Sequence, residues 1–444
     1  MQRSPRQVGL ATVTALTLTT ALTIVPASAA GAHHRPDLST TAAIESYLVS
    51  IGVDPAEAVW QQGLRNYAGP SCPGAGWTCV AADAPIVQIA PSGGANVFEC
   101  SGLRCVAVQV VPLGAGQNEA ECERGDKHAD TALQVCDITQ DNETGNNVAV
   151  INQSIEQKGA VVTARQVARI TQTEDSGNNI AGVRQVIGQS SQVKGTDQSQ
   201  DAHQAATVDQ VTESGDNSSN IDQSQKQTQH ASGSTTITQD QNTTVGTDVT
   251  DVCDQPGVPP FDQAKNQCAH TTQASSILLG VGGDNRSNLN QDIKETQTAS
   301  SAENADQQQG TELGGQVGTK TQTSSGVSLS EADQDTDQVQ TATGVTNVNQ
   351  SQDAGDPRCC QVQATNPANQ ADILQTTDQS ASDEDADQDA TLIGHCLSSG
   401  NCHVLQTATT DDDSETTECT GECGFVFTEC TTVEGPTMCS GGVD

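Results

Sequence analysis

The feature that most constrains the fold of this chain is a register of glutamine, glycine and asparagine that recurs between residues 138 and 352. In three copies, a Gln is followed by Gly after five residues, by Asn after seven and by a second Gln after thirteen. A fourth copy has Leu278 in place of the first Gln. The residues of the register are Gln140, Gly145, Asn147, Gln153, Gln172, Gly177, Asn179, Gln185, Gln210, Gly215, Asn217, Gln223, Gly283, Asn285 and Gln291.

The copies are unevenly spaced. Their glycines are 32, 38 and 68 residues apart, and the last interval predicts two units, one of them degenerate and carrying an insertion around Cys253 and Cys268. A later fragment, Asn347 to Gln350, repeats the ending Asn220 to Gln223. The polar composition of this region favours a flexible spacer, whereas recurrence in register favours stacked units. Both interpretations remain open at this point.

Each copy has a turn formed by Gly and Asn or Asp, which tolerate the backbone angles of tight turns. The flanking residues alternate with the period of two that is typical of strands. A single unit of this kind cannot bury its inner face, so copies are expected to stack as a β-solenoid. Equivalent Gln and Asn side chains then form ladders about 4.8 Å apart, in which each amide both donates and accepts.

The segment Gly145 to Gln153, with Gly, Asn, Ala and Gln at fixed positions, resembles the curlin repeat of curli-type fimbrial subunits, and so does Gly177 to Gln185. Gln140 and Gln172 correspond to the first glutamine of that repeat, although the gap to Gly is longer here. The resemblance covers residues 138–230 and, more weakly, 273–352. It implies an extracellular structural or adhesive protein that assembles with further copies through exposed strand edges.

Composition excludes several classes of protein. The formal net charge is −38, which argues against nucleic-acid binding, because phosphate recognition needs Lys and Arg. Only 4 Phe, 2 Trp and 2 Tyr are present in 444 residues, too few for ordinary globular cores. No cofactor is expected. The acidic runs at 383–385 and 411–413 favour solvated segments, with calcium as the alternative, although neither run has the ligand spacing of an EF-hand.

The first 29 residues predict a secretory signal peptide. Arg3 and Arg6 precede an apolar stretch from Val8 to Val25, and Ala27-Ser28-Ala29 provides small residues for cleavage. We therefore expect a secreted or surface-associated protein. No later apolar run reaches the roughly 20 residues that span a bilayer, so no transmembrane segment is expected after the signal is removed.

Residues 37–136 predict a small disulfide-bonded α+β head, and residues 353–444 an acidic, Cys-rich tail or cap. In the head we expect helices at 42–51 and 54–64, followed by strands at 86–90, 97–100 and 105–111, the last two forming a hairpin. The 16 cysteines of an exported chain favour disulfides between near neighbours. The candidate pairs are Cys72 with Cys79, Cys100 with Cys105, Cys122 with Cys136, Cys253 with Cys268, and Cys396 with Cys402.

No nucleophile elbow, zinc-protease motif or phosphate-binding loop occurs, so we expect no enzyme. The sequence predicts a mainly β fold, an irregular β-solenoid of Gln/Asn-rich repeats at 138–352. The expected function is structural or adhesive, at the cell surface or in the matrix, with self-association or other matrix proteins as partners. The alternatives are a flat solenoid face that binds ice or carbohydrate, suggested by Thr319, Thr321 and Thr323, and a disordered extracellular spacer.

Overall fold

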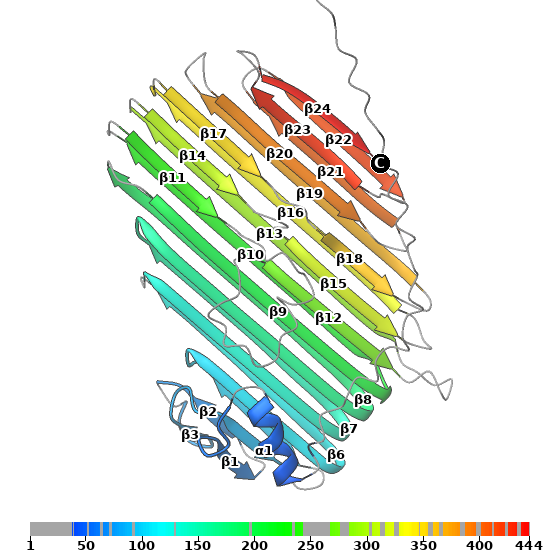
Figure 1. The fold of residues 1–444 in the computed structure, drawn as a ribbon. Coiled ribbons are helices and arrows are strands. Elements are labelled where there is room, and N and C mark those ends of the chain that lie inside the picture. The colour runs from blue at the N-terminus through cyan, green and yellow to red at the C-terminus, as the bar shows by residue number, and fades with distance from the viewer. Residues whose placement is uncertain are drawn as a thin grey trace, which may run out of the picture. The chain divides into compact units, whose positions relative to one another are not determined.

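The computed structural model describes residues 38, 40–50, 53–62, 65–70, 73–90, 94–127, 130–194, 198–232, 236–242, 267–275, 284–301, 304–310, 316–323, 328–345, 347–353, 358–363, 367–381, 387–396, 401–410, 413–421, 425–432 and 437–443. These residues belong to one compact unit, Pro36–Asp444. Within them the fold is mainly β, as the sequence predicts (Figure 1).

The described residues contain one helix, α1 (Thr41–Ser50), and strands throughout the rest of the unit. The strands are β1 (Val59–Gln62), β2 (Arg65–Ala68), β3 (Thr78–Val80), β4 (Ile86–Ile89), β5 (Ala95–Cys100), β6 (Arg104–Lys127), β7 (Thr131–Lys158), β8 (Val161–Lys194), β9 (Gln198–Ser214), β10 (Asn217–Ser232), β11 (Thr236–Asn242), β12 (Gln267–Ser275), β13 (Asn285–Ser300), β14 (Asn304–Gly310), β15 (Gln316–Thr323), β16 (Ser328–Thr343), β17 (Asn347–Asp353), β18 (Arg358–Gln363), β19 (Pro367–Ala381), β20 (Asp387–Cys396), β21 (Asn401–Thr409), β22 (Ser414–Gly421), β23 (Phe425–Thr432) and β24 (Thr437–Val443).

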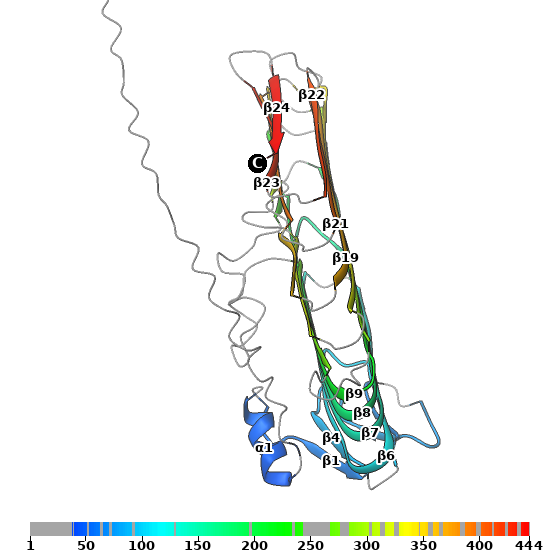
Figure 2. The same ribbon diagram turned by 90° about the vertical axis from the view of Figure 1, so that its right-hand side faces the viewer.

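The strands form two facing layers that are joined by bends (Figure 2). The long strand β8 passes through both layers: its first half pairs with β9, and its second half pairs with β10. We call the layer that contains β9 the first layer, the layer that contains β10 the second layer, and one passage through both a rung. Neighbouring rungs pair in parallel from β1 to β21, with shifts of register within the pairs β6–β7 and β15–β18.

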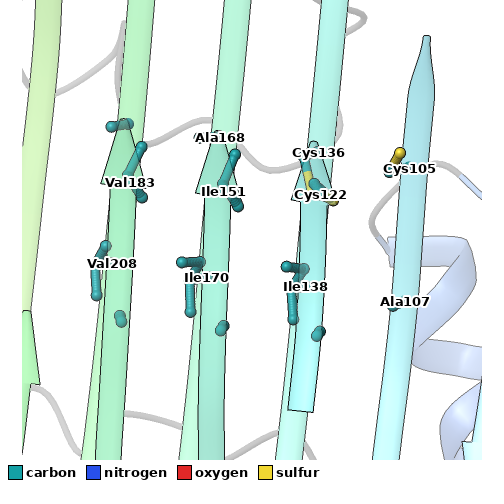
Figure 3. Close-up of a cluster of buried hydrophobic side chains, with 14 of the residues drawn as sticks. Cys105, Ala107, Cys122, Cys136, Ile138, Ile151, Ala168, Ile170, Val183 and Val208 are labelled. Atoms are coloured by element: carbon teal, nitrogen blue, oxygen red, sulfur yellow. A yellow bond between two sulfur atoms is a disulfide. The ribbon is translucent and has the colours of Figure 1, made fainter. Parts of the chain in front are cut away.

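Alternation with a period of two places every second side chain between the layers. In the first layer, Ile138, Ile170 and Val208 are buried in one row across three rungs (Figure 3). A second row, in the second layer, contains Ile151, Val183, Ile221 and Leu289, all buried. Full burial of such a side chain contributes roughly 1.5–3 kcal/mol, so these rows stabilise the stacking of rungs.

Helix α1 covers the outer face of the first layer at its N-terminal end. Thr40 caps the helix, because its Oγ1 accepts a hydrogen bond of 3.2 Å from the backbone N–H of Ala43. Ile44 and Leu48 are buried in a cluster that includes Val87 and Val108 of the first layer. The apolar side chains at helical spacing therefore serve to cover the sheet.

The second helix expected at 54–64 is wrong. Asp54 Oδ1 accepts a hydrogen bond of 2.9 Å from the N–H of Ala56, but the residues that follow form a turn. The chain then enters β1, in which Val59 and Trp60 pair with Ile86 and Val87. Pairing with β4 overrides the local preference for a helix, which is a weak determinant of structure.

The hairpin expected around Cys100 and Cys105 is also wrong. Strand β5 pairs in parallel with the second half of β6, where Ala95 lies beside Gln117. The first half of β6 pairs with β4, where Ala107 lies beside Ile86. The chain between β5 and β6 therefore crosses from the second layer to the first, instead of reversing within one sheet.

The interval of 68 residues between Gly215 and Gly283 contains one rung, and the prediction of two units is wrong. Strand β10 pairs directly with β13, and β9 pairs directly with both β11 and β12. The fragment at 347–350 is also misassigned, because β17 lies beside β14 and β20, at a different position from β10. An insertion between β11 and β12 changes the spacing of the repeat without adding a rung.

One hydrogen-bonded sheet runs through the boundaries predicted at 136 and 353. Strands β6 and β7 pair from Arg104↔Val135 to Lys127↔Glu156. Strand β19, within the predicted tail, pairs in parallel with β16 over Ser328↔Pro367 to Ala342↔Ala381. The last strands differ from the rest, since β22, β23 and β24 are antiparallel to their neighbours.

Candidate functional site

The interior of the first layer contains a continuous ladder of glutamine side chains, with one from each of five successive rungs. Each Nε2 donates to the Oε1 of the preceding rung over 2.7–2.8 Å. All five side chains are fully buried. The members of this ladder are Gln88, Gln109, Gln140, Gln172 and Gln210.

The same glutamines also join the two layers. The Nε2 of Gln140 donates to the carbonyl oxygen of Val148 over 2.9 Å, and that of Gln172 to the carbonyl of Ile180 over 2.9 Å. Both amide hydrogens are therefore used, one along the ladder and one across the interior. A buried amide left without partners costs about 1–3 kcal/mol, and this arrangement removes that cost at every rung.

A ladder of asparagines lies just after the bend, in the second layer. Its Nδ2 groups donate to the Oδ1 of the next rung over 2.9–3.0 Å, through Asn96, Asn118, Asn147, Asn179, Asn217 and Asn285. This direction is opposite to that of the glutamine ladder, whose members donate toward the N-terminus. The amide dipoles of the two ladders therefore oppose each other along the stacking axis.

The second glutamine of the register forms a ladder of its own. Gln185, Gln223, Gln291 and Gln334 each donate to the preceding member over 2.7–2.8 Å, beginning at Gln153. In the fourth copy, Gln273 is the register partner of Gln210, whereas Leu278 and Gly283 lie outside the described residues. The first glutamine of this copy therefore lies five residues earlier than the sequence alignment predicts.

Other ladders were not predicted from the sequence. Gln134, Gln166 and Gln204 form one in the first layer, and Gln157, Gln189 and Gln227 another in the second. Two more run toward the C-terminus, one through Gln198, Gln239, Gln307, Gln350 and Gln388 and one through Gln229, Gln297, Gln340 and Gln379. The first two of these ladders join glutamines that are 32 and then 38 residues apart, which are the spacings of the glycines in the repeat. A search of the sequence for every Gln with partners at these two spacings would have identified them.

Stacked glycines form the bend between the layers. Gly145, Gly177 and Gly215 have φ of +132°, +143° and +147°. A Cβ on Gly177 would collide with the carbonyl oxygen of Gly145, and one on Gly215 with that of Gly177. Only glycine permits both this backbone conformation and this close approach.

Two pairs of cysteines lie close together in the interior of the first rungs. The sulfur atoms of Cys100 and Cys105, and those of Cys122 and Cys136, lie at disulfide-bonding distance, with Cα atoms 6.0 and 6.6 Å apart. Figure 3 shows the second pair beside Ile151 and Ala168, with which Cys122 and Cys136 are in register. Each cysteine pair therefore lies where later rungs place an apolar pair.

Of the three remaining candidate pairs, two lie partly outside the described residues. Cys79 lies on β3, and its predicted partner Cys72 is outside the described residues, so this pair stays a prediction. Cys253 is likewise outside the described residues, while Cys268 lies on β12. Cys396 on β20 is in register with Cys359, and Cys402 lies on β21. The pairs Cys253 with Cys268 and Cys396 with Cys402 stay predictions.

Carboxylates gather on the outer face of the second layer. Asp292 and Asp335 are direct neighbours in the register of β13 and β16. Burial, followed by the charge of Asp292, raises the pKa of Asp335. Burial also raises the pKa of Asp292, while Lys294 opposes that shift. Within the described part of the chain, no three His, Cys, Asp or Glu side chains gather in a metal-binding geometry; most of 383–385 and 411–413 lies outside that part.

An acidic pocket of about 340 Å³ lies on the second layer near its N-terminal end, lined by Tyr67, Glu99, Cys100, Ser101, Glu121, Glu123 and Gly125. The Tyr67 hydroxyl and Ser101 Oγ are 2.6 Å apart and hydrogen-bonded. Burial, and next the neighbouring Glu121, raises the pKa of Glu99. Because three glutamates line the pocket, its charge suits a cationic group better than an anion.

The two ends of the stack are built differently. At the N-terminal end, β1 and β3 are strands of four and three residues, and Trp77 packs edge-on against Tyr67 with Arg65 above its ring. At the C-terminal end, antiparallel β22 covers β21, and β23 and β24 cover β20. Short edge strands limit pairing with other chains.

No protein-family model, curated protein or solved structure matches this chain significantly. In the described part of the chain, no helix has the length and apolar character needed to cross a bilayer.

Proposed function

We propose that this chain is an exported, non-enzymatic structural or adhesive protein of the cell surface or matrix, built as a curlin-like β-solenoid. The observation that carries the proposal is the unbroken glutamine ladder from Gln88 to Gln210. A ladder in which every amide is satisfied by its neighbours makes each rung a template for the next. Such a stack provides a rigid, extended scaffold with repeated outer faces.

Self-association is part of this proposal. The end of a parallel stack presents backbone N–H and C=O groups that can pair with another chain. At the C-terminal end, β22 lies where a further parallel strand would otherwise extend β21. We therefore assign β22, β23 and β24 the role of a cap that limits growth at this end.

Charge provides a second limit. The net charge of −38 repels other copies at low salt, and this repulsion is screened within about 8 Å at physiological ionic strength. Protonation of Asp and Glu below about pH 4 removes much of the charge. The full-length protein is therefore expected to be monomeric at neutral pH and low salt, and to associate in acid.

The test compares the full-length mature protein with a variant truncated after Thr410, which lacks the three antiparallel strands. Thioflavin fluorescence and electron microscopy are recorded from pH 3 to pH 8, with circular dichroism to establish that both proteins contain β structure. We expect faster fibre formation by the truncated protein at each pH. If neither protein forms fibres at any pH, the self-association is wrong; a random-coil spectrum of the full-length protein would favour a spacer.

A second candidate function is recognition of ice or carbohydrate by a flat outer face. The residues that first suggested it, Thr319 and Thr321, are in register with His270 and Thr272. The row of Thr272 and Thr321 ends at Asp209 on one side and at Gln363 on the other, so it forms no continuous threonine ladder. On the second layer, however, Thr228 is in register with Thr296, and Thr298 with Thr341. Thermal hysteresis and glycan-array binding test this function, and the variant T296V with T298V should abolish either signal.

A further inference from the structure

One interior row breaks the pattern of paired amides. Asn142, Glu174 and Thr212 are in register on β7, β8 and β9, each three residues before a glycine of the bend. They are 0%, 1% and 2% exposed. A carboxyl group in such a place is costly when ionised, because the interior solvates charge poorly.

The row has more acceptors than donors. The Nδ2 of Asn142 donates to the carbonyl oxygen of Gly116 over 3.1 Å. Among the described residues, no hydrogen bond reaches Asn142 Oδ1, either carboxyl oxygen of Glu174 or Thr212 Oγ1. The Thr212 hydroxyl can donate a hydrogen bond to Glu174. An ionised Glu174, however, has no hydrogen to donate to the Oδ1 of Asn142. One further donor would complete the row.

A second row has the same defect. Gln157, Gln189 and Gln227 form a ladder in which each member donates toward the N-terminus. The next position is Glu295, in register with Gln227 and 1% exposed. Gln338 donates to Glu295 Oε2 over 2.9 Å, as the ladder requires. The Oε1 of Gln227 receives no hydrogen bond from any described residue, and Glu295 is the group placed to donate to it.

We infer that Glu174 and Glu295 are neutral carboxylic acids in the folded protein, each acting as the hydrogen-bond donor that closes its row. In the first row, Thr212 donates to Glu174 and Glu174 donates to Asn142. In the second row, Gln338 donates to Glu295 and Glu295 donates to Gln227. Each carboxyl group thus replaces an amide while keeping one donor and one acceptor, on condition that it holds a proton.

The electrostatics of Glu174 agree with this assignment. Burial raises its pKa to about 8, the Thr212 hydroxyl opposes the shift, and the charge of Asp175 adds to it. The neighbours in register, Asn142 on β7 and Thr212 on β9, are uncharged. Asp175 is therefore the charged residue that acts on this carboxyl group, and it favours the neutral form.

This protonation couples folding to pH. Because the folded pKa of Glu174 lies above its ordinary value of 4.5, folding takes up a proton between about pH 4.5 and pH 8. The stability that the neutral acid provides is fully present below pH 4.5 and is lost as pH rises through 8. Within this window, the unfolding equilibrium constant should rise up to tenfold per pH unit.

The experiment uses the full-length mature protein with Glu174→Gln, Glu295→Gln and the double substitution. The side-chain amide of glutamine donates a hydrogen bond at any pH, without taking up a proton. Each variant should therefore unfold at a higher urea concentration than the wild type at pH 8. Below pH 4.5, where both forms donate, the difference should vanish. The control Glu213→Gln changes an exposed carboxylate on the residue after Thr212 and should leave the pH dependence as in the wild type.

A measurement on the wild type does not depend on how the variants fold. The infrared spectrum of the wild type at pH 6 should show the carbonyl band of a protonated carboxylic acid. The same band should be weaker in the spectrum of each Gln variant at this pH. The inference is overturned if Glu174 and Glu295 are ionised at pH 6. It is equally overturned if calcium or sodium ions, added at pH 8, stabilise the wild type but not Glu174→Gln, because a cation then fills the place of the proton.

Discussion

The rungs at the two ends of the stack have different interiors. In β7, the buried row in the second layer includes Ile151 and Ile155, which alternate with Gln153 and Gln157. The first rungs, up to β7, add two cysteine pairs at disulfide-bonding distance. In β16, the buried side chains include Gln334, Thr336, Gln338 and Gln340, with Ala342 as the apolar member. The same parallel register therefore encloses apolar rows beside the amide ladders near the N-terminus, and mainly amide rows near the C-terminus.

The comparison shows two ways to stabilise one architecture. Apolar rows gain free energy by removing surface from water, and a disulfide that closes a short loop adds about 2–3 kcal/mol. Amide rows gain only about 0.5–1.5 kcal/mol for each net hydrogen bond, and they lose more when a partner is removed. We therefore expect the N-terminal rungs to nucleate the stack and the C-terminal rungs to depend on them.

The largest loss of stability is expected at the glycine bend that joins the two layers. Gly177→Ala should destabilise the protein by more than about 4 kcal/mol, because it combines a disfavoured φ with a collision against the Gly145 carbonyl. Gly182→Ala is the matched control on the same strand, since a Cβ there meets nothing within 4 Å. Urea unfolding followed by circular dichroism measures both. Equal stability of the two variants would show that the stacked bend is not required.

The apolar rungs provide the next largest effect. Ile151→Ala removes a fully buried side chain from the row formed with Val183 and Ile221, at a cost of about 3 kcal/mol. Hydrogen exchange should then become faster along β7 and in the rungs beyond it, because a stacked array is stabilised by nearest neighbours. Val150→Ala, on the adjacent outward-facing residue, should change little. Faster exchange confined to β16 and β19 would reverse the assignment of the nucleating end.

In the amide rungs, Gln340→Leu should cost about 2 kcal/mol although it adds apolar surface. Gln340 donates to Gln297 Oε1 over 3.0 Å and to the Gln307 carbonyl over 3.1 Å, and it accepts from Gln379. Leucine removes all three of these hydrogen bonds. Val339→Thr, on the neighbouring outer position, is the control. A leucine variant as stable as the wild type would mean that the ladders fill space and add no net hydrogen bonding.

The repeat register predicted much of this interior. It identified the positions of Gln140, Asn147 and Gln153 and the turn at Gly145, because residues that must stack recur at the same offset. The ladder members in the predicted head, Gln109 and Asn118, were missed because the glycine spacing changes there. Insertions between strands alter sequence distance without altering the register.

Long-range pairing explains the other differences. The sequence around Asp54 has the residues of a helix start, and only the partner strand β4 reveals that the chain extends instead. The equivalence of Cys122 and Cys136 with Ile151 and Ala168 is invisible in a linear sequence, since it depends on which strands lie side by side. Local sequence patterns therefore predicted the single repeat. Which strands lie side by side became known only from the structure.

The smallest effect is expected on the outer face, where like charges meet between rungs of the amide region. Asp335→Asn should stabilise the protein at neutral pH by less than about 1 kcal/mol, because solvent screens partly exposed pairs. The folded pKa of Asp335 lies above its ordinary value of 3.8, through burial and then through the charge of Asp292. The neutral acid is therefore favoured in the folded state, and the gain from asparagine should disappear below pH 3.8. Glu331→Gln, on an exposed residue of the same strand, is the control. Urea midpoints at pH 3 and pH 7 measure the difference, and a gain that persists at pH 3 would show that side-chain shape, and not charge, limits the packing of β13 against β16.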